Sequence, residues 1–380
     1  MKPTTVMVVA GDPSGDAVAA DLVRALAGSL GSARFIGAGG LRMAEAGVRS
    51  SFDLTADAVI GVSDVFRKLP LFRRRMRELT RLAAEEKPEL IVLVDFSGFN
   101  RRLARAIRNV CGRGPKIVQF VSPQVWASRP GRADKMARDF DLLLCLFPFE
   151  KEWYARRVPR FRVEWVGHPI LDRYKAGGRE EGPVPTVVLL PGSRHGELKR
   201  HLPVVLEAAN LIAAKHQARF KMVAPSQEMA DMARAGLATG AAKIEIQTGG
   251  LEAALSTATI AIASTGTVTL ECAWFGVPTV AFYKTSALTY AIGRQIVSVN
   301  YLAMPNILAG KALFPELIQN EATPRNIAGA ALELLENAAR RREIQAGLRE
   351  VVSALGGPGA TARAAAAILD LEFEAPEKSR

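Results

Sequence analysis

The feature that most constrains the fold is a regular alternation of short apolar runs with longer stretches of helical periodicity. The runs are rich in Val, Ile and Leu, and they cover residues 6–10, 34–37, 90–94, 116–121, 142–146, 186–190, 219–223, 243–246, 260–263 and 279–282. Continuous apolar runs of this length are typical of parallel strands that are covered by helices on both faces. The alternation therefore predicts an α/β fold built on doubly wound parallel sheets.

A segment rich in Gly, Pro and charged residues, 174–185, divides these runs into two series. It has no hydrophobic periodicity, and such a composition is typical of an interdomain linker. We therefore predict two Rossmann-like domains, residues 1–174 and 184–345, which face each other across a cleft. In such domains the carboxyl ends of the strands present the ligand-binding loops.

The composition excludes several classes of protein. The chain has 380 residues and is 49% hydrophobic, which is enough to bury substantial cores and excludes a disordered chain. Cys111, Cys145 and Cys272 form no C-x-x-C pair, so a reducing compartment is favoured over a disulfide framework. The N-terminal residues lack a signal-peptide pattern, which predicts a cytoplasmic location.

The net charge of +12 indicates a polyanionic partner. Nucleic acid is disfavoured because aromatic residues do not alternate with the arginines as stacking platforms would require. Residues 66–82 form a basic amphipathic stretch that either docks on an anionic membrane surface or is the solvated face of a helix. No apolar stretch approaches the roughly 20 residues that cross a bilayer, so we predict peripheral membrane contact.

Two strand-end loops of the first domain carry candidate polar groups. Asp12 and Ser14 lie in the loop 11–16, whose glycine spacing fits neither a dinucleotide fingerprint nor a P-loop. The alternative to a ligand-binding role is helix capping by Ser14 or Asp16. Asp95 directly follows the run 90–94, where a partly desolvated carboxylate suits a general base, and capping of the next helix is again the alternative.

A third loop, residues 121–129, is polar and interrupted by proline. It contains Ser122 and Trp126. The indole of Trp126 is either a platform for a sugar or an acyl chain, or an ordinary core residue.

The second domain offers two loops suited to anions. Gly192, Ser193 and Arg194 follow the run 186–190 and place backbone N–H groups and a guanidinium at the end of a strand, which suits a diphosphate; a solvated surface turn is the alternative. The second loop, after the run 260–263, opens a helix with small hydroxyl residues and glycine, and a carboxylate about two turns further on suits a ribose diol. Its candidate residues are Ser264, Thr265, Gly266, Thr267 and Glu271.

Other chemistries are disfavoured. The four histidines have no H-E-x-x-H spacing, and no G-x-S-x-G elbow is present. We therefore predict neither a metal nor a cofactor.

Together these loops resemble the lipid-A-disaccharide synthase family, which comprises inverting glycosyltransferases of the B-type fold. The matching stretches occur in the family's order and spacing over nearly the whole chain: residues 10–16, 121–127, 147–150, 166–169, 189–194, 264–271 and 304–310. The resemblance implies transfer of 2,3-diacylglucosamine from its UDP carrier to the 6-hydroxyl of 2,3-diacylglucosamine 1-phosphate. Inversion implies one displacement, with a base on the acceptor hydroxyl and fixed donors on the leaving diphosphate.

The resemblance also implies residue roles. Asp95 matches the family's base, Arg194 its diphosphate-side arginine, and Asn306 a polar residue needed for activity, while His168 lies in a matching motif. The residues 264–267 and Glu271 resemble the family's nucleotide cradle.

The chain departs from the family in its acceptor half. Asp12 and Asp64 stand where the family usually has Glu, which shortens each side chain by about 1.5 Å, and Ser128 replaces a tryptophan. These departures motivate one alternative, a non-catalytic paralogue that binds UDP-sugar or lipid. The second alternative is another UDP-sugar-dependent enzyme of the same fold, either a muramyl-lipid N-acetylglucosaminyltransferase or a UDP-sugar 2-epimerase.

The resemblance further implies that helices in residues 346–372 cross back onto the first domain. It also implies peripheral association with the cytoplasmic side of the inner membrane. Exchange of the C-terminal segment between two subunits, and hence a homodimer, has precedent in the family.

Overall fold

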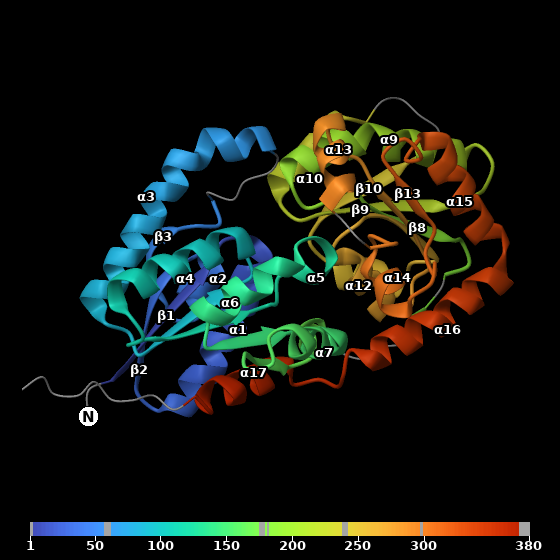
Figure 1. Cartoon of the computed structure of the whole chain (residues 1–380). Helices are drawn as coiled ribbons and strands as arrows, with labels where there is room; N and C mark the ends of the chain where they lie inside the picture. The colour runs from blue at the N-terminus through green and yellow to red at the C-terminus, as the bar shows by residue number, and fades with distance from the viewer. Residues whose placement is uncertain are drawn as a thin grey trace, which may run out of the picture. The chain divides into compact units, whose positions relative to one another are not determined.

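The computed structural model describes residues 3–56, 62–174, 179–180, 182–237, 242–296 and 299–371, apart from the side chains of 62–68, 288 and 292 (Figure 1). The chain divides into two compact units. Unit 1 comprises Met1–Arg173 and Leu355–Arg380, and unit 2 comprises Tyr174–Ala354. Our expectation that two domains face each other across a cleft stays a prediction.

Unit 1 contains a seven-stranded parallel sheet in the order β3-β2-β1-β4-β5-β6-β7. Its strands are β1 (Thr4–Ala10), β2 (Ala33–Gly39), β3 (Arg49–Asp53), β4 (Leu90–Val94), β5 (Lys116–Phe120), β6 (Leu142–Cys145) and β7 (Arg162–Trp165). Its helices are α1 (Pro13–Leu30), α2 (Leu41–Glu45), α3 (Val62–Glu86), α4 (Ser97–Cys111), α5 (Val125–Ser128), the 3-10 turn η1 (Pro130–Arg132), α6 (Ala133–Asp139), α7 (Pro148–Arg157), α8 (Ile170–Arg173) and α17 (Ala360–Leu369).

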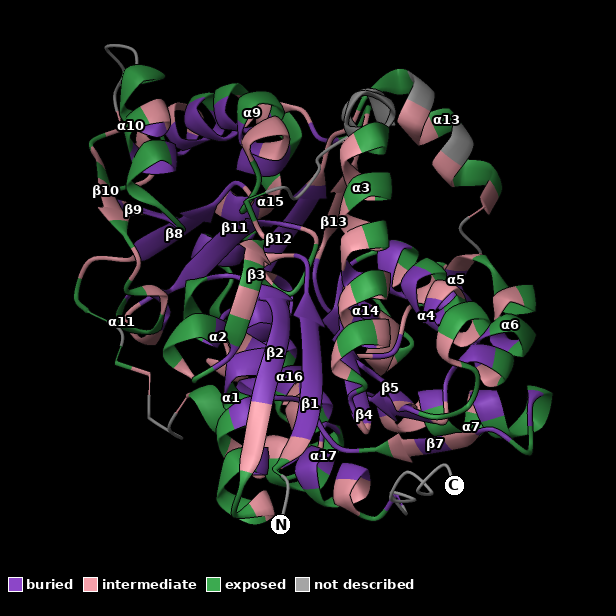
Figure 2. Ribbon diagram, turned by 90° about the vertical axis from the view of Figure 1, so that its left-hand side faces the viewer, coloured by how far each residue is buried: buried purple, intermediate pink, exposed green. Residues whose placement is uncertain are grey.

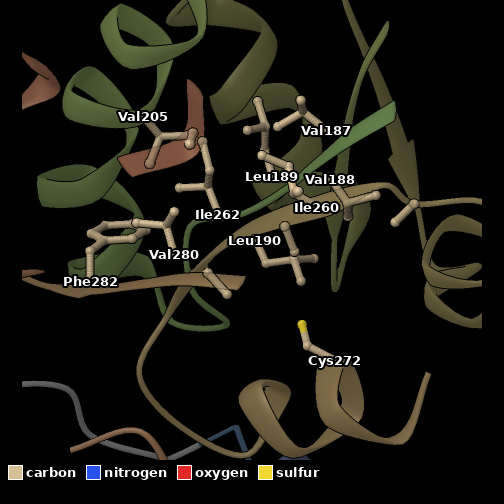
Figure 3. Packing of buried hydrophobic residues seen from close by; sticks show 14 of the residues in the cluster. Val187, Val188, Leu189, Leu190, Val205, Ile260, Ile262, Cys272, Val280 and Phe282 are labelled. Atoms are coloured by element: carbon tan, nitrogen blue, oxygen red, sulfur yellow. The ribbon is translucent and has the colours of Figure 1, made fainter. Parts of the chain in front are cut away.

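Unit 2 contains a six-stranded parallel sheet in the order β10-β9-β8-β11-β12-β13. Its strands are β8 (Thr186–Leu190), β9 (Arg219–Ala224), β10 (Ile244–Thr248), β11 (Ile260–Ser264), β12 (Thr279–Tyr283) and β13 (Glu316–Ile318). Its helices are α9 (His195–Ala213), α10 (Gln227–Ala235), α11 (Leu251–Ser256), α12 (Val268–Trp274), α13 (Ala287–Ile296), α14 (Met304–Ala309), α15 (Pro324–Glu336) and α16 (Ala338–Ala354). Figure 3 shows how Leu189, Ile262 and Val280, from β8, β11 and β12, contribute to its core.

The parallel α/β architecture predicted from the apolar runs is confirmed. The central strands, such as β4 and β11, are buried along their whole length, because helices cover both faces of each sheet. Figure 2 shows that β1 is also buried, apart from its half-buried first residue, Thr4.

Three strands were not predicted from the sequence: β3, β7 and β13. Each lies at the edge of its sheet, and each contains residues that are half-buried or exposed. An edge strand has one neighbour and less helical cover, so its sequence does not form a continuous apolar run.

The strand order reverses at the same point in both sheets. β1 pairs with β2 and β4, and β8 pairs with β9 and β11. In the register, Ala10 lies beside Val94 in unit 1, and Leu190 lies beside Ala263 in unit 2. Ligands of doubly wound sheets bind beyond the carboxyl ends of the strands at such switch points. The fold thus brings together the loops after β1 and β4, and those after β8 and β11.

The C-terminal helices divide between the units at Leu355. We expected residues 346–372 on the first domain, but α16 lies in unit 2, where Ile344, Leu348 and Val351 are part of the core. The next helix, α17, contacts α1 and α8 in unit 1. Asp172 of α8 accepts hydrogen bonds from the backbone N–H groups at the start of α17, including that of Thr361 at 2.9 Å.

No helix in the described part of the chain is both long and apolar enough to cross a membrane.

Candidate active site

The loop after β1 begins helix α1 with a side-chain cap. Asp12 is the N-cap residue, and its Oδ1 accepts a hydrogen bond of 2.7 Å from the backbone N–H of Gly15. The alternative that Ser14 or Asp16 caps this helix does not hold, because Ser14 is exposed and Asp16 is buried with other partners. The carboxylate of Asp16 accepts from the N–H groups of Gly40 at 2.7 Å and of Arg42 at 3.0 Å, so it caps α2 instead.

The turn after β4 has an unusual backbone. Asp95 and Phe96 have φ values of 48° and 37°, in the left-handed region that residues other than glycine rarely adopt. Such conformations cost about 1–3 kcal/mol each and persist only where the surroundings enforce them. Phe96, not Asp95, is the N-cap residue of α4, so the alternative that Asp95 caps this helix does not hold.

Asp12 and Asp95 are brought together at Gly15. A methyl group at Gly15 would lie 3.3 Å from Oδ1 of Asp12 and 3.5 Å from Cβ of Asp95. Both side chains are half-buried. Asp64, the third predicted carboxylate, lies in α3, and its side chain is outside the described residues.

A second polar group of unit 1 surrounds the buried side chain of Glu150. Oε1 of Glu150 accepts from the indole Nε1 of Trp126 at 3.1 Å, and Oε2 accepts from the N–H of Phe147 at 3.1 Å. Burial raises the pKa of Glu150 to about 7, although these hydrogen bonds lower it. The buried hydroxyl of Ser122 lies 3.4 Å from that of Tyr154, which is also buried.

Glu150 was missed as a functional candidate, although it lies in the Phe-Pro-Phe-Glu stretch 147–150. An acid at the third position of a helix is an ordinary capping signal. Its complete burial is visible only in the structure.

His168 and Trp126 lie beside this group. The imidazole of His168 is buried, and its centroid lies 5.7 Å from that of Phe147. Its Nδ1 accepts from the N–H of Ile170 at 3.1 Å, and burial lowers the pKa of His168 to about 4. Trp126 is half-buried and packs edge-on against Phe149 with centroids 4.9 Å apart.

In unit 2 the loops after β8 and β11 meet at Gly192. Its φ of 125° suits glycine, and a methyl group there would lie 3.5 Å from Oγ of Ser264 and 3.0 Å from Oε2 of Glu197. The Arg194 guanidinium is largely exposed, and its Nη1 lies 3.2 Å from Oε1 of Glu197. Ser193 is exposed.

The loop after β11 leads from buried to accessible residues. Ser264 is buried, Thr265 is half-buried, and Gly266 and Thr267 are exposed. Glu271 is buried in α12, and its Oε1 accepts from the hydroxyl of Tyr174 at 2.8 Å.

His201 was missed by the sequence analysis, yet it fixes the first of these loops. Its ring is fully buried, with Nδ1 2.7 Å from the carbonyl of Pro191 and Nε2 3.0 Å from the N–H of Lys284. A neutral ring that donates from Nδ1 and accepts at Nε2 satisfies both contacts.

Asn306 lies in the interior of unit 2. Oδ1 accepts from the N–H of Phe314 at 2.8 Å, and Nδ2 donates to Phe314 O at 2.9 Å and to Oε1 of Glu316 at 2.8 Å. The side chain is fully buried, so this geometry fixes neighbouring chain segments rather than presenting the amide to a ligand.

Comparison with known proteins identifies the family. The lipid-A-disaccharide synthetase family profile matches residues 6–370. The chain belongs to this family. A lipid-A-disaccharide synthase from Solibacter usitatus is 37% identical over 377 residues, which cover 96% of this chain and 97% of the relative. Because it belongs to the lipid-A-disaccharide synthetase family, the chain is a glycosyltransferase that functions in lipid A biosynthesis, as predicted.

Solved structures support the B-type fold predicted for this lipid-A-disaccharide synthetase family member. A calicheamicin glycosyltransferase matches with a TM-score of 0.60 at 17% identity, covering 98% of this chain and 99% of the other. A UDP-GlcNAc 2-epimerase from Neisseria meningitidis, solved with UDP-GlcNAc bound, matches with a TM-score of 0.63 at 11% identity, covering 97% and 100%.

Proposed function

We propose that this chain transfers 2,3-diacylglucosamine from UDP-2,3-diacylglucosamine to the 6-hydroxyl of 2,3-diacylglucosamine 1-phosphate, with inversion and release of UDP. The observation that carries this proposal is the family match over residues 6–370, together with polar loops at both switch points.

We assign the UDP-sugar to unit 2. The loop 192–194 and Ser264 adjoin at the switch point, and Arg194 supplies positive charge for a diphosphate. Thr265, Gly266 and Thr267 extend this surface, and Glu271 is assigned to the ribose. The pairing of Arg194 with Glu197 predicts that the incoming diphosphate competes with this carboxylate for the guanidinium.

We assign the acceptor to unit 1, with Asp95 as the general base. Its carboxylate removes the proton from the 6-hydroxyl as the oxygen attacks the anomeric carbon and the bond to the UDP oxygen breaks. Asp12 lies beside the same glycine as Asp95 and is assigned to the acceptor half of the reaction. We assign acceptor binding to Ser122, Trp126 and His168. Asp64 is assigned to the same half of the reaction, and Asn306 is assigned to positioning.

We propose that the chain associates peripherally with the cytoplasmic face of the inner membrane through α3. Arg73 and Arg77 lie one turn apart on this helix, are exposed, and have no ion-pair partner among the described residues. Leu69, 37% exposed, adds an apolar contact. A homodimer stays a prediction.

The decisive experiment supplies purified protein with both diacylated substrates, without added metal, and measures disaccharide and UDP. Equal amounts of the two products are expected. UDP-sugar consumption with epimerised product would favour a 2-epimerase, and UDP-sugar binding without turnover would favour a non-catalytic paralogue.

A further inference from the structure

Left-handed backbone is concentrated at the ends of two neighbouring strands of unit 1. Asp95 and Phe96 follow β4, and Val121, with φ of 68°, follows β5. For a β-branched residue such as Val121 this conformation is a genuine outlier. These three strained residues follow the carboxyl ends of adjacent strands, and they require neighbours that hold them in place.

The side chain of Asn100 provides one such restraint. It is fully buried in the first turns of α4, and its Nδ2 donates to Val94 O at 3.1 Å and to Asp95 O at 2.8 Å. Its Oδ1 is buried without a hydrogen-bond partner. An unpaired buried acceptor costs about 1–3 kcal/mol, so the residue is poorly suited to a purely stabilising role.

The side chain of Gln119 provides the second restraint, from β5. It is 1% exposed, and its Nε2 lies 3.0 Å from Asp95 O, 3.2 Å from Phe120 O and 3.2 Å from Val121 O. One amide therefore contacts carbonyls on both strained turns. The N–H of Asp95 donates to Phe120 O at 2.9 Å, which closes the connection between the strands.

Aromatic packing fixes the other side of the turn. The ring of Phe96 lies 5.9 Å from that of Phe72 and 5.4 Å from that of Phe99, measured between centroids. A methyl group at Gly11 would lie 2.1 Å from Cδ1 of Phe96, so the glycine loop leaves room for this ring.

We propose that Asn100 and Gln119 are positioning residues that hold the main chain of Asp95 in its left-handed conformation and thereby aim its carboxylate at the acceptor. The proposal rests on the proposed function of Asp95. Neither amide is assigned a contact with substrate. Loss of either donor lets the turn relax, and misplacement of a reacting group by about 1 Å can lower the rate about 100-fold.

The test replaces each amide by an apolar side chain of similar size, in Asn100→Leu and Gln119→Met. Disaccharide synthesis is expected to lose about tenfold to 100-fold in kcat, with KM for the donor and calorimetric UDP affinity within twofold of the starting enzyme. Asn109→Leu, at an exposed asparagine on the same helix, is the matched control and should keep full kcat.

Combination with Asp95→Asn separates positioning from general stabilisation. If the amides act through Asp95, adding Gln119→Met to Asp95→Asn lowers kcat no further, because interacting residues are non-additive. A second loss of equal size, or full kcat in both single variants, would overturn the proposal. If Asn100→Leu does not fold, Gln119→Met carries the test alone.

The same set of variants separates this inference from the assignment of the base. Full turnover by Asp95→Asn would overturn both. An inactive Asp95→Asn together with fully active Asn100→Leu and Gln119→Met would overturn only the positioning role.

Discussion

The side chains of Asp12 and Asp95 adjoin at Gly15, although 82 positions separate them in the chain. Asp12 follows β1 and Asp95 follows β4, and these two strands are direct neighbours in the sheet. A methyl group at Gly15 would lie 3.3 Å from Oδ1 of Asp12 and 3.5 Å from Cβ of Asp95. The switch point of unit 1 therefore holds two aspartates, one after each of the neighbouring strands β1 and β4.

Asp95→Asn removes the proposed base while keeping the size of the side chain. We expect turnover to fall by about 100-fold to 10,000-fold, the usual contribution of general base catalysis. UDP-donor affinity should stay near that of the starting enzyme, because the donor is assigned to unit 2. A disaccharide assay and calorimetry measure the two quantities.

The control for this variant is Asp134→Asn, which changes an exposed aspartate of α6. It should leave turnover unchanged. Equal turnover by Asp95→Asn and Asp134→Asn would rule out the base assignment.

Arg194→Ala removes the guanidinium assigned to the diphosphate. We expect UDP to bind about tenfold to 100-fold more weakly, because charge-assisted hydrogen bonds contribute about 1.5–3 kcal/mol. Calorimetric titration with UDP measures this change. Arg200→Ala, at an exposed arginine of α9, is the control; unchanged affinity in Arg194→Ala would count against the assigned role.

Glu150 and His168 are expected to give opposite pH dependences of stability. The pKa of Glu150 is raised by burial from 4.5 to about 7, so between these pH values the folded state holds a proton that the unfolded state has lost. Its contribution to stability therefore falls as the pH rises through this window. The pKa of His168 is lowered by burial from 6.5 to about 4, so its contribution rises with pH between 4 and 6.5.

Variants at these two positions should reveal the opposing slopes. In Glu150→Gln the free energy of unfolding of unit 1 should rise more steeply between pH 4.5 and 6.5 than in the starting protein. In His168→Gln it should fall over the same range. Urea unfolding at several pH values measures both slopes, and parallel curves for all three proteins would contradict the prediction.

Membrane association through α3 should depend on salt. Screening weakens the attraction between arginines and anionic lipid, so we expect the protein to leave acidic vesicles as the ionic strength rises. Arg73→Ala combined with Arg77→Ala should weaken flotation at low salt, whereas Arg24→Ala, whose side chain pairs with Asp21, should not. Flotation that is insensitive to salt would favour apolar anchoring instead.

Local signals predicted much of the fold because they depend on near neighbours in the chain. The runs at 90–94 and 186–190 coincide with β4 and β8, since buried parallel strands require continuous apolar residues. The edge strands β3 and β13 lacked this signal because one side of each is less covered.

The sequence alone determined the parallel α/β class, the family, and the polar residues that follow the strands, because periodicity and motif spacing are properties of the chain itself. Only the tertiary structure decided that Asp12 and Asp95 adjoin, that Asp16 caps a different helix, and that Glu150 is buried. Strand order and burial arise from packing between distant segments. No local pattern encodes which strand ends become neighbours.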